Sequence, residues 1–189
     1  MDRKKFDQLL GRLDTESERA ARRAVGEFQK AGTDVLSRLC DSVVHDRRVR
    51  VRRWCAEALG GFASAESERA LKRALRDPNM SVRYHAVRAA DRYELERLGG
   101  VIVKLVDDPS PGVRHVAVRA LGRLRPRGTV AALSRALQDG KWHVRQAAAE
   151  ASAMVKSPRL AAHLRAAMDD ERPAVRRAAS RALRPLIDQ

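Results

Sequence analysis

The feature that most constrains this chain is a repeat with a period of 31 residues. An aspartate marks each copy, from Asp46 to Asp170. Such a period is typical of proteins that stack small structural units, because one unit cannot bury its hydrophobic face alone. The five aspartates are Asp46, Asp77, Asp108, Asp139 and Asp170.

Residues at fixed distances after each aspartate also recur. Valine stands five residues later, a small residue nine later, alanine twelve later and a larger residue sixteen later. Steps of four, three and four residues place these side chains on one face of an α-helix. The pattern predicts that the second helix of each repeat buries Val113, Ala117, Ala120, Leu124 and their equivalents.

The start of this second helix is also predicted. Asp77-Pro78 and Asp108-Pro109 fit an aspartate N-cap followed by proline in the first helical position. The aspartate would accept hydrogen bonds from free amides of the first turn, and its charge would suit the helix dipole. The sequence therefore predicts that each marker aspartate caps a helix.

A first helix is predicted before each aspartate. Apolar residues stand six and two positions upstream of it, and the pattern extends back to a degenerate first repeat. The predicted core positions of the first helices are Leu9, Leu13, Cys40, Val44, Leu71, Leu75, Ile102, Val106, Leu133, Leu137, Leu164 and Met168. The second helix of the degenerate repeat would run through Ala20, Ala24, Val25 and Phe28.

Together these patterns predict an all-α fold, an α-solenoid of about six two-helix repeats in a single domain. Every repeat shows helical periodicity, and the period leaves no room for a linker or a second domain. The predicted repeats span residues 1–31, 32–62, 63–93, 94–124, 125–155 and 156–189.

The line Asp-Pro-Ser-Pro-Gly-Val-Arg-His-Val-Ala-Val-Arg-Ala-Leu-Gly, from Asp108 to Gly122, resembles HEAT repeats. It is most similar to the short bacterial type named after phycobilin lyases. The resemblance implies the solenoid fold but no single activity, because the family includes scaffolds, adaptors, lyase subunits and a few enzymes. It also implies a structural ladder between adjacent repeats, formed by the aspartates and the arginines that follow the valines. The ladder residues are Asp46, Arg52, Asp77, Arg83, Asp108, Arg114, Asp139, Arg145, Asp170 and Arg176.

The chain is strongly basic. Its 39 basic and 24 acidic residues give a net charge of +15, which favours acidic partners such as nucleic acid or an acidic protein surface. The basic residues are 32 Arg and only 7 Lys, a skew that a GC-rich genome would also produce. No apolar run approaches the length of a membrane span, and two cysteines do not make a disulfide framework. We therefore expect a cytoplasmic protein with reduced thiols and no membrane insertion.

The sequence offers little for catalysis. HEAT-like hydroxylases of deoxyhypusine hold iron with His-Glu pairs, and no histidine here precedes a glutamate. His115 and His143, one repeat apart, lack the further ligands of a metal site. Asp91 beside Tyr84 is the one pair that a HEAT-like DNA glycosylase could use, against the simpler reading of a solvated carboxylate. We expect no catalytic residue, no metal, no cofactor and no small-molecule substrate.

The predicted binding site is the concave wall formed by the second helices, as in other solenoids. Positions 7, 11, 14 and 15 residues after each aspartate should point outward. They are rich in arginine, which suits carboxylates and phosphates because its planar group donates two hydrogen bonds at once. With Trp142, which departs from the repeat pattern as an exposed aromatic or as a ring packed on a helix, the candidates are Arg53, Tyr84, Arg88, Arg92, His115, Arg119, Arg123, Trp142, Gln146, Arg177 and Arg181.

This pattern predicts a non-catalytic scaffold or adaptor that binds an acidic protein. A nucleic-acid-binding module that contacts phosphates without reading sequence is the main alternative, and a glycosylase or a lyase-type accessory subunit is a third. Glu57, Asp91 and Glu150 are the acidic residues expected on the same wall. The first helices are basic too, for example at Arg73 and Arg135, so the charge is not confined to the wall.

Overall fold

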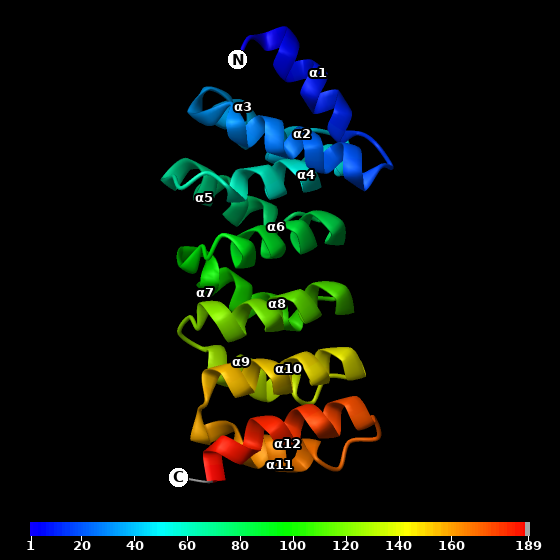
Figure 1. The fold of residues 1–189 in the computed structure, drawn as a ribbon, viewed down its shortest axis with the longest axis vertical. Coiled ribbons are helices and arrows are strands. Elements are labelled where there is room, and N and C mark those ends of the chain that lie inside the picture. The colour runs from blue at the N-terminus through cyan, green and yellow to red at the C-terminus, as the bar shows by residue number, and fades with distance from the viewer. Residues whose placement is uncertain (188–189) are drawn as a thin grey trace. The chain divides into compact units, whose positions relative to one another are not determined.

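The computed structural model describes residues 1–187, and these contain α-helices and short 3-10 turns but no strand. The chain divides into two compact units, Met1–Leu98 (unit 1) and the residues from Gly99 onward (unit 2) (Figure 1). The all-α prediction is therefore confirmed. Each unit consists of helices in successive pairs, as expected for two-helix repeats.

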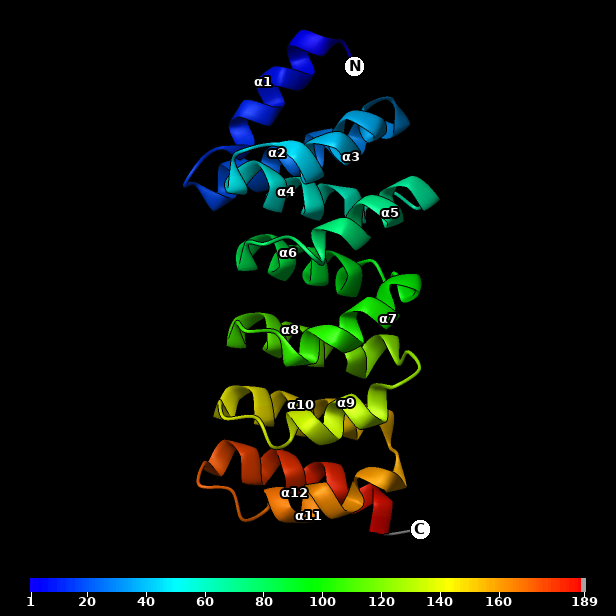
Figure 2. The ribbon, with the colours of Figure 1, turned by 180° about the vertical axis from the view of Figure 1, so that it is seen from behind.

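Unit 1 is built from three helix pairs. Its elements are α1 (Arg3–Leu13), α2 (Glu18–Lys30), η1 (Gly32–Val35), α3 (Leu36–His45), α4 (Val49–Gly60), α5 (Ala65–Ala74), α6 (Met80–Arg92) and η2 (Glu96–Leu98). The second helices pack in a row, with α4 between α2 and α6. The first helices α3 and α5 form a layer behind this row, which is seen from the other side in Figure 2.

Unit 2 repeats the same arrangement. Its elements are α7 (Gly99–Ile102), η3 (Val103–Asp107), α8 (Pro111–Leu124), α9 (Thr129–Ala136), α10 (Trp142–Val155), η4 (Pro158–Leu160), α11 (Ala161–Ala167) and α12 (Pro173–Ile187). The helix α10 packs between α8 and α12, while α9 and α11 lie in the other layer. The first helix of this unit is short, because α7 passes into the 3-10 turn η3 after one turn.

The predicted core of the second helices is confirmed. All five valines at the fifth position, such as Val113, are fully buried, and so are the small residues at the ninth. The alanines at the twelfth position are at most 2% exposed, and Ala120 is fully buried. Small side chains in the middle of these helices let neighbouring second helices approach closely. The sixteenth position is less uniform, since Leu124 is buried whereas Val155 is half-buried.

Three of the core positions predicted on the first helices are wrong. In α3, Leu39 and Val43 are fully buried while Cys40 and Val44 are half-buried, so the buried face is rotated by one residue. The helix α2 runs through Ala20, Ala24, Val25 and Phe28 as predicted; the last three are buried together with Ala21, whereas Ala20 is exposed. Met168 is 40% exposed at the end of α11, because no helix of the described chain follows α12 to cover this edge.

The predicted aspartate N-caps are also wrong. The N-cap residues are Asn79 for α6, which begins at Met80, and Ser110 for α8, which begins at Pro111. Asp77 instead accepts a hydrogen bond from the amide of Asn79 at 2.8 Å, and Asp108 accepts one from Ser110 at 2.9 Å. Each aspartate therefore closes a turn ahead of the helix.

Arginines bind these aspartates across neighbouring repeats. Arg114 Nε lies 2.6 Å from Asp139 Oδ2, and Arg114 Nη2 lies 2.9 Å from Asp139 Oδ1. The third nitrogen, Nη1, donates to the carbonyl of Asp108 in its own repeat at 2.9 Å. Arg114 thus binds a carboxylate of the next repeat and a carbonyl of its own. The same two-point pairing joins Arg52 to Asp77 and Arg145 to Asp170.

Candidate binding face

The structure places the predicted binding residues on the second helices of each unit. In unit 1, Arg53 lies on α4, and Tyr84, Arg88 and Arg92 lie on α6. Because α4 packs directly on α6, these four residues belong to one surface. Arg92 is 48% exposed in its side chain, while Arg53, Tyr84 and Arg88 are half-buried.

A buried carboxylate lies beneath these arginines. Glu57 on α4 is only 3% exposed, although the repeat pattern predicts it to point outward. Its Oε1 accepts a hydrogen bond from Arg92 Nη1 at 2.9 Å, and its Oε2 lies 3.5 Å from His85 Nδ1. Burial alone would raise the pKa of Glu57, but His85 and the charges of Arg92 and Arg88 outweigh it and lower the pKa. Glu57 is therefore a buried anion that holds part of the basic surface in place.

Aromatic rings lie beside Arg53 and Arg88, the other candidate arginines of unit 1. The Arg53 guanidinium lies 5.4 Å from the centre of the Trp54 ring, and that of Arg88 lies 5.8 Å from the Tyr84 ring. Trp54 also meets His85 edge to face, with ring centres 4.9 Å apart. Such stacking restricts a guanidinium without using its hydrogen-bond donors. These arginines are thus oriented before any partner arrives.

Tyr93 explains the unusual end of the third repeat. Its hydroxyl accepts a hydrogen bond from Gln29 Nε2 at 2.9 Å, and its ring packs on Gly60. A Cβ atom at Gly60 would lie 2.5 Å from the Tyr93 ring, so glycine is required for this contact. The tyrosine therefore joins α2, α4 and α6 and does not belong to the binding surface.

In unit 2 the candidate residues form an open surface over α8, α10 and α12. Arg119 and Arg123 lie on α8, and Arg177 and Arg181 lie on α12, all of them exposed. The helix between them contributes Gln146 and Glu150, which are joined by a hydrogen bond of 2.8 Å. This surface has no counterpart of the buried carboxylate of unit 1 among its described residues.

The N-terminal end of the same surface carries His115, His143 and Trp142. His115 Nδ1 lies 3.1 Å from the carbonyl of His143, and burial lowers the pKa of His115. Trp142 is 41% exposed and meets His143 edge to face, with ring centres 5.9 Å apart. Residues 1–187 contain no group of three or more His, Cys, Asp or Glu placed to hold a metal ion.

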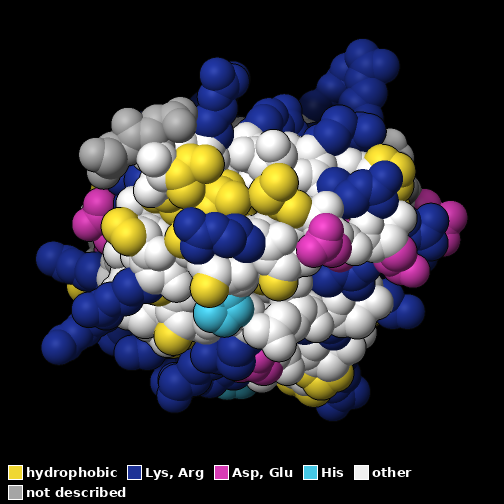
Figure 3. Space-filling model, turned by 90° about the horizontal axis from the view of Figure 1, so that it is seen from below, with side chains coloured by type: hydrophobic (Ala, Val, Ile, Leu, Met, Phe, Trp, Pro, Cys, Tyr) yellow, Lys and Arg dark blue, Asp and Glu magenta, His cyan; other side chains and the backbone are white. Residues whose placement is uncertain are grey.

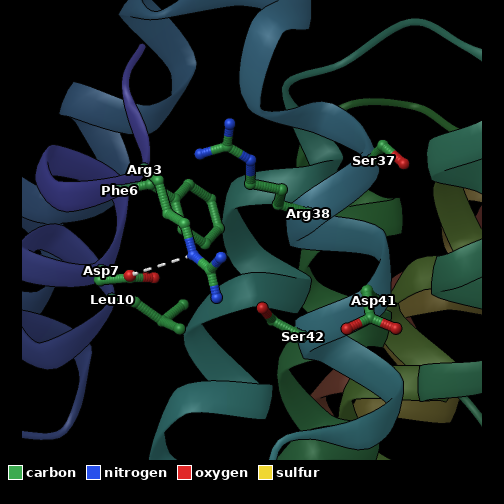
Figure 4. A pocket seen from close by; sticks show the side chains of 8 residues that line it. All are labelled: Arg3, Phe6, Asp7, Leu10, Ser37, Arg38, Asp41 and Ser42. Carbon is green, nitrogen blue, oxygen red and sulfur yellow. Dashed lines mark ion pairs between the residues drawn. The ribbon is translucent and has the colours of Figure 1, made fainter.

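Unit 1 has a further pocket of about 630 Å³ between α1 and α3 (Figure 4). Arg38 lies over the Phe6 ring at 5.3 Å from its centre, and Arg3 pairs with Asp7 at 3.9 Å. With Asp41 the pocket carries two basic and two acidic side chains, so its charge is balanced. It lies on first helices, away from the predicted binding residues, and the sequence pattern did not indicate it.

Basic side chains are not confined to the second helices. Seen from the end of unit 2 formed by α11 and α12, lysines and arginines surround a group of hydrophobic side chains (Figure 3). Ile187 and Met168 are among the exposed hydrophobic residues of this end, and Arg165 is exposed on α11. Within residues 1–187 no helix combines the length and apolarity that a membrane crossing requires.

The model of the HEAT-repeat family matches residues 36–98 and 100–184, which is most of the chain. The chain belongs to the HEAT-repeat family. The matched segments include the line from Asp108 to Gly122 that resembles this family in sequence. None of the curated proteins has a significant sequence match to this HEAT-repeat chain.

Solved structures share the HEAT-repeat fold at low sequence identity. The Escherichia coli protein YibA matches 96% of this chain and 74% of its own, with 22% identity and a TM-score of 0.75. A designed armadillo repeat protein in complex with the peptide (KR)4 matches 95% and 98%, with 19% identity and a TM-score of 0.63. The CpcE–CpcF complex of phycocyanin lyase from Nostoc sp. PCC7120 matches 90% and 73%, with 19% identity and a TM-score of 0.61. The expected similarity to phycobilin-lyase repeats is therefore confirmed at the level of the fold.

The repeat pattern did not indicate two features of the candidate sites. The Trp54–His85 pair lies at the eighth position after Asp46 and Asp77, where the later HEAT repeats carry valine or alanine. That change from small to aromatic residues was a signal for a special site in unit 1. Met154 was also overlooked, although it is 40% exposed at the fifteenth position, where neighbouring repeats carry Arg92 and Arg123.

Proposed function

We propose that this HEAT-repeat chain is a non-catalytic scaffold that binds an acidic protein through the second-helix surfaces. The observation that carries the proposal is the state of the arginines in unit 2. Arg119, Arg177 and Arg181 are exposed and have no ion-pair partner among residues 1–187. In contrast, Arg52, Arg114 and Arg145 of the ladder donate to the carboxylates of Asp77, Asp139 and Asp170. Exposed guanidinium groups on two helices of one surface, α8 and α12, are suited to binding several carboxylates of one partner.

The fold class and its relatives support a binding role. Solenoid surfaces of HEAT and armadillo type commonly bind proteins or peptides along their second helices. The designed armadillo repeat protein is complexed with (KR)4, a basic peptide. Our chain has the opposite requirement, because its net charge of +15 and its arginine-rich surface favour an acidic segment. The two free cysteines, Cys55 buried and Cys40 half-buried, support a reducing compartment such as the cytoplasm.

Nucleic acid is the second candidate, and the net charge of +15 favours it. Arginine binds phosphate as well as carboxylate, and such binding would be independent of sequence. Against it, Trp142 is the one exposed aromatic ring among the described residues of unit 2, so stacking of successive bases is poorly served. The two candidates therefore require a direct comparison.

The test compares two double variants that reverse charges, one on the second-helix surface of unit 2 and one elsewhere in the same unit. Arg119→Glu with Arg181→Glu changes α8 and α12, whereas Arg159→Glu with Arg165→Glu changes exposed positions on η4 and α11. Both double variants lower the net charge equally. Affinity for fluorescent poly-L-glutamate and for duplex DNA is measured by anisotropy at two salt concentrations.

We expect the α8–α12 double variant to weaken poly-L-glutamate binding roughly tenfold, and the control to weaken it less than about twofold. Equal losses in both variants would mean diffuse attraction and would contradict a defined surface. The nucleic-acid alternative would be favoured if the protein bound duplex DNA more tightly than poly-L-glutamate and with a steep salt dependence, and if only the α8–α12 variant lost affinity for DNA.

A further inference from the structure

The helix α10 interrupts the basic surface of unit 2. Its four outward residues are Gln146, Glu150, Ala153 and Met154, and none of them is basic. The helices on both sides carry exposed arginines at the corresponding distances from their aspartates. The surface is therefore a basic rim around a central strip of different chemistry.

The floor of this strip is apolar. Ala147 and Ala151 line a pocket of about 160 Å³ between α8 and α10, and Met154 completes its wall. A Cβ atom at Gly122 would lie 3.2 Å from Met154 Sδ and 3.0 Å from Ala151 Cβ. The thioether therefore lies over the glycine of α8, yet Met154 remains 40% exposed. A methionine in such a position can adapt its shape to an incoming apolar group.

A second pocket continues the strip on the other side of α10. It has a volume of about 350 Å³ and is lined by Glu150, Ala153, Ala178 and Arg181. Glu150 lines both pockets. The two pockets thus form one surface across three helices of unit 2.

Charge surrounds this apolar floor asymmetrically. Arg119 and Arg123 flank it from α8, and Arg181 flanks it from α12. The one acidic residue among the lining residues, Glu150, accepts a hydrogen bond from Gln146 at 2.8 Å. Three arginines against one glutamate leave the rim positive, so it would repel a basic peptide and attract an acidic one.

We infer that this surface, which we call the Met154 patch (Arg119, Arg123, Ala147, Glu150, Ala151, Ala153, Met154, Ala178 and Arg181), binds a peptide segment with one apolar side chain between acidic ones. The apolar side chain contacts Met154 and the alanines, and the flanking carboxylates pair with the arginines of the rim. The inference rests on the proposed function and specifies its partner. Nucleic acid fits the patch poorly, because no aromatic ring lines it and a base would find no stacking partner.

The experiment compares two peptide probes on the full chain. One has the sequence Glu-Asp-Glu-Leu-Glu-Asp-Glu, and the other has serine in place of leucine. Binding is followed by NMR of methionine methyl groups labelled with ¹³C, with Met80, Met154 and Met168 as separate reporters. We expect the leucine peptide to bind at least about fivefold more tightly, because it buries a larger apolar side chain. We also expect it to shift the Met154 methyl signal and leave Met168 unchanged.

A matched pair of variants identifies the patch. Met154→Gln should abolish the preference for leucine and leave affinity for the serine peptide unchanged. Met168→Gln is the control, because Met168 is also 40% exposed but lies outside the second helices. It should leave both affinities unchanged.

The outcomes separate this inference from the proposed function. Equal affinity for the two peptides would overturn the patch, while the scaffold proposal would stand if Arg119→Glu with Arg181→Glu still weakened both. If neither peptide binds and duplex DNA shifts the Met154 methyl signal, the occupant is nucleic acid and both proposals are wrong.

Discussion

Among single residues, Glu57 has the environment most different from what its repeat position suggests. Its carboxylate is 3% exposed and is held by Arg92, with His85 3.5 Å away. Arg92 is half exposed, so a partner's carboxylate that binds Arg92 would compete with Glu57 for it. The buried glutamate therefore both orients the basic surface of unit 1 and limits how strongly that arginine can bind a partner.

We predict that Glu57→Ala lowers the free energy of unfolding by about 2 kcal/mol, since Arg92 loses its carboxylate and a space opens beside His85. Urea denaturation measures the effect. Glu150→Ala removes an exposed glutamate from a second helix and should change stability by less than about 0.5 kcal/mol. Equal stability of Glu57→Ala and wild type would show that the buried pair contributes nothing.

The repeat pattern could not have placed Glu57 correctly. It predicts which face of α4 points outward, but Arg92 and His85 from α6 contact the carboxylate at the eleventh position. His85 and Arg92 reach over it because both are long and polar, and a pattern of positions contains no information about side-chain length. The valine and alanine core was predictable, since it depends on period alone.

Among elements, the links between consecutive second helices depend on the ladder. Arg145 binds Asp170 of the next repeat at 2.6 Å and the carbonyl of Asp139 in its own at 2.8 Å. Burial alone would raise the pKa of Asp139, but the hydrogen bond from Arg114 and neighbouring groups outweigh burial and lower the pKa; the hydrogen bond from Arg145 lowers the pKa of Asp170. A lowered pKa in the folded state means that the ionised carboxylate stabilises the fold.

The sign of the pH dependence follows. This stabilisation is complete above the usual aspartate range near about pH 4 and is lost as pH falls through the lower folded-state pKa values. We predict that Asp139→Asn lowers the free energy of unfolding by about 1–2 kcal/mol at neutral pH and makes little difference at the acid end. Asp169→Asn is the control, because Asp169 is an exposed aspartate next to Asp170. If Asp139→Asn and wild type differed by the same free energy of unfolding at every pH, the ionised ladder carboxylate would not be the cause.

The element boundaries show where sequence reasoning succeeded and failed. The predicted second helices are all observed, whereas the first helix of unit 2 is the short α7, which begins at Gly99. The N-cap was misplaced at Asp77 because this aspartate has two roles, closing a turn and binding Arg52, and the second role depends on a neighbouring repeat. A local motif predicts a local contact and cannot reveal a partner 25 residues away.

At the scale of the whole molecule, charge is the dominant property. The net charge of +15 is distributed over first and second helices, so non-specific attraction to any polyanion is expected. The second helices of unit 2 differ in the arrangement of their charges, because exposed arginines on α8 and α12 lie on both sides of Met154. A binding site requires this arrangement and not the total charge.

The measurement that tests this account most directly is a map of backbone amide chemical shifts of the full chain during titration with poly-L-glutamate. The account predicts that the largest changes fall on the second helices, around Arg119, Arg123, Arg177 and Arg181, and that they saturate at a single affinity. Changes of the same size around Arg73, Arg135 and Arg165 on the first helices would show that the protein attracts acidic chains everywhere, and would contradict the second-helix surface as the binding site.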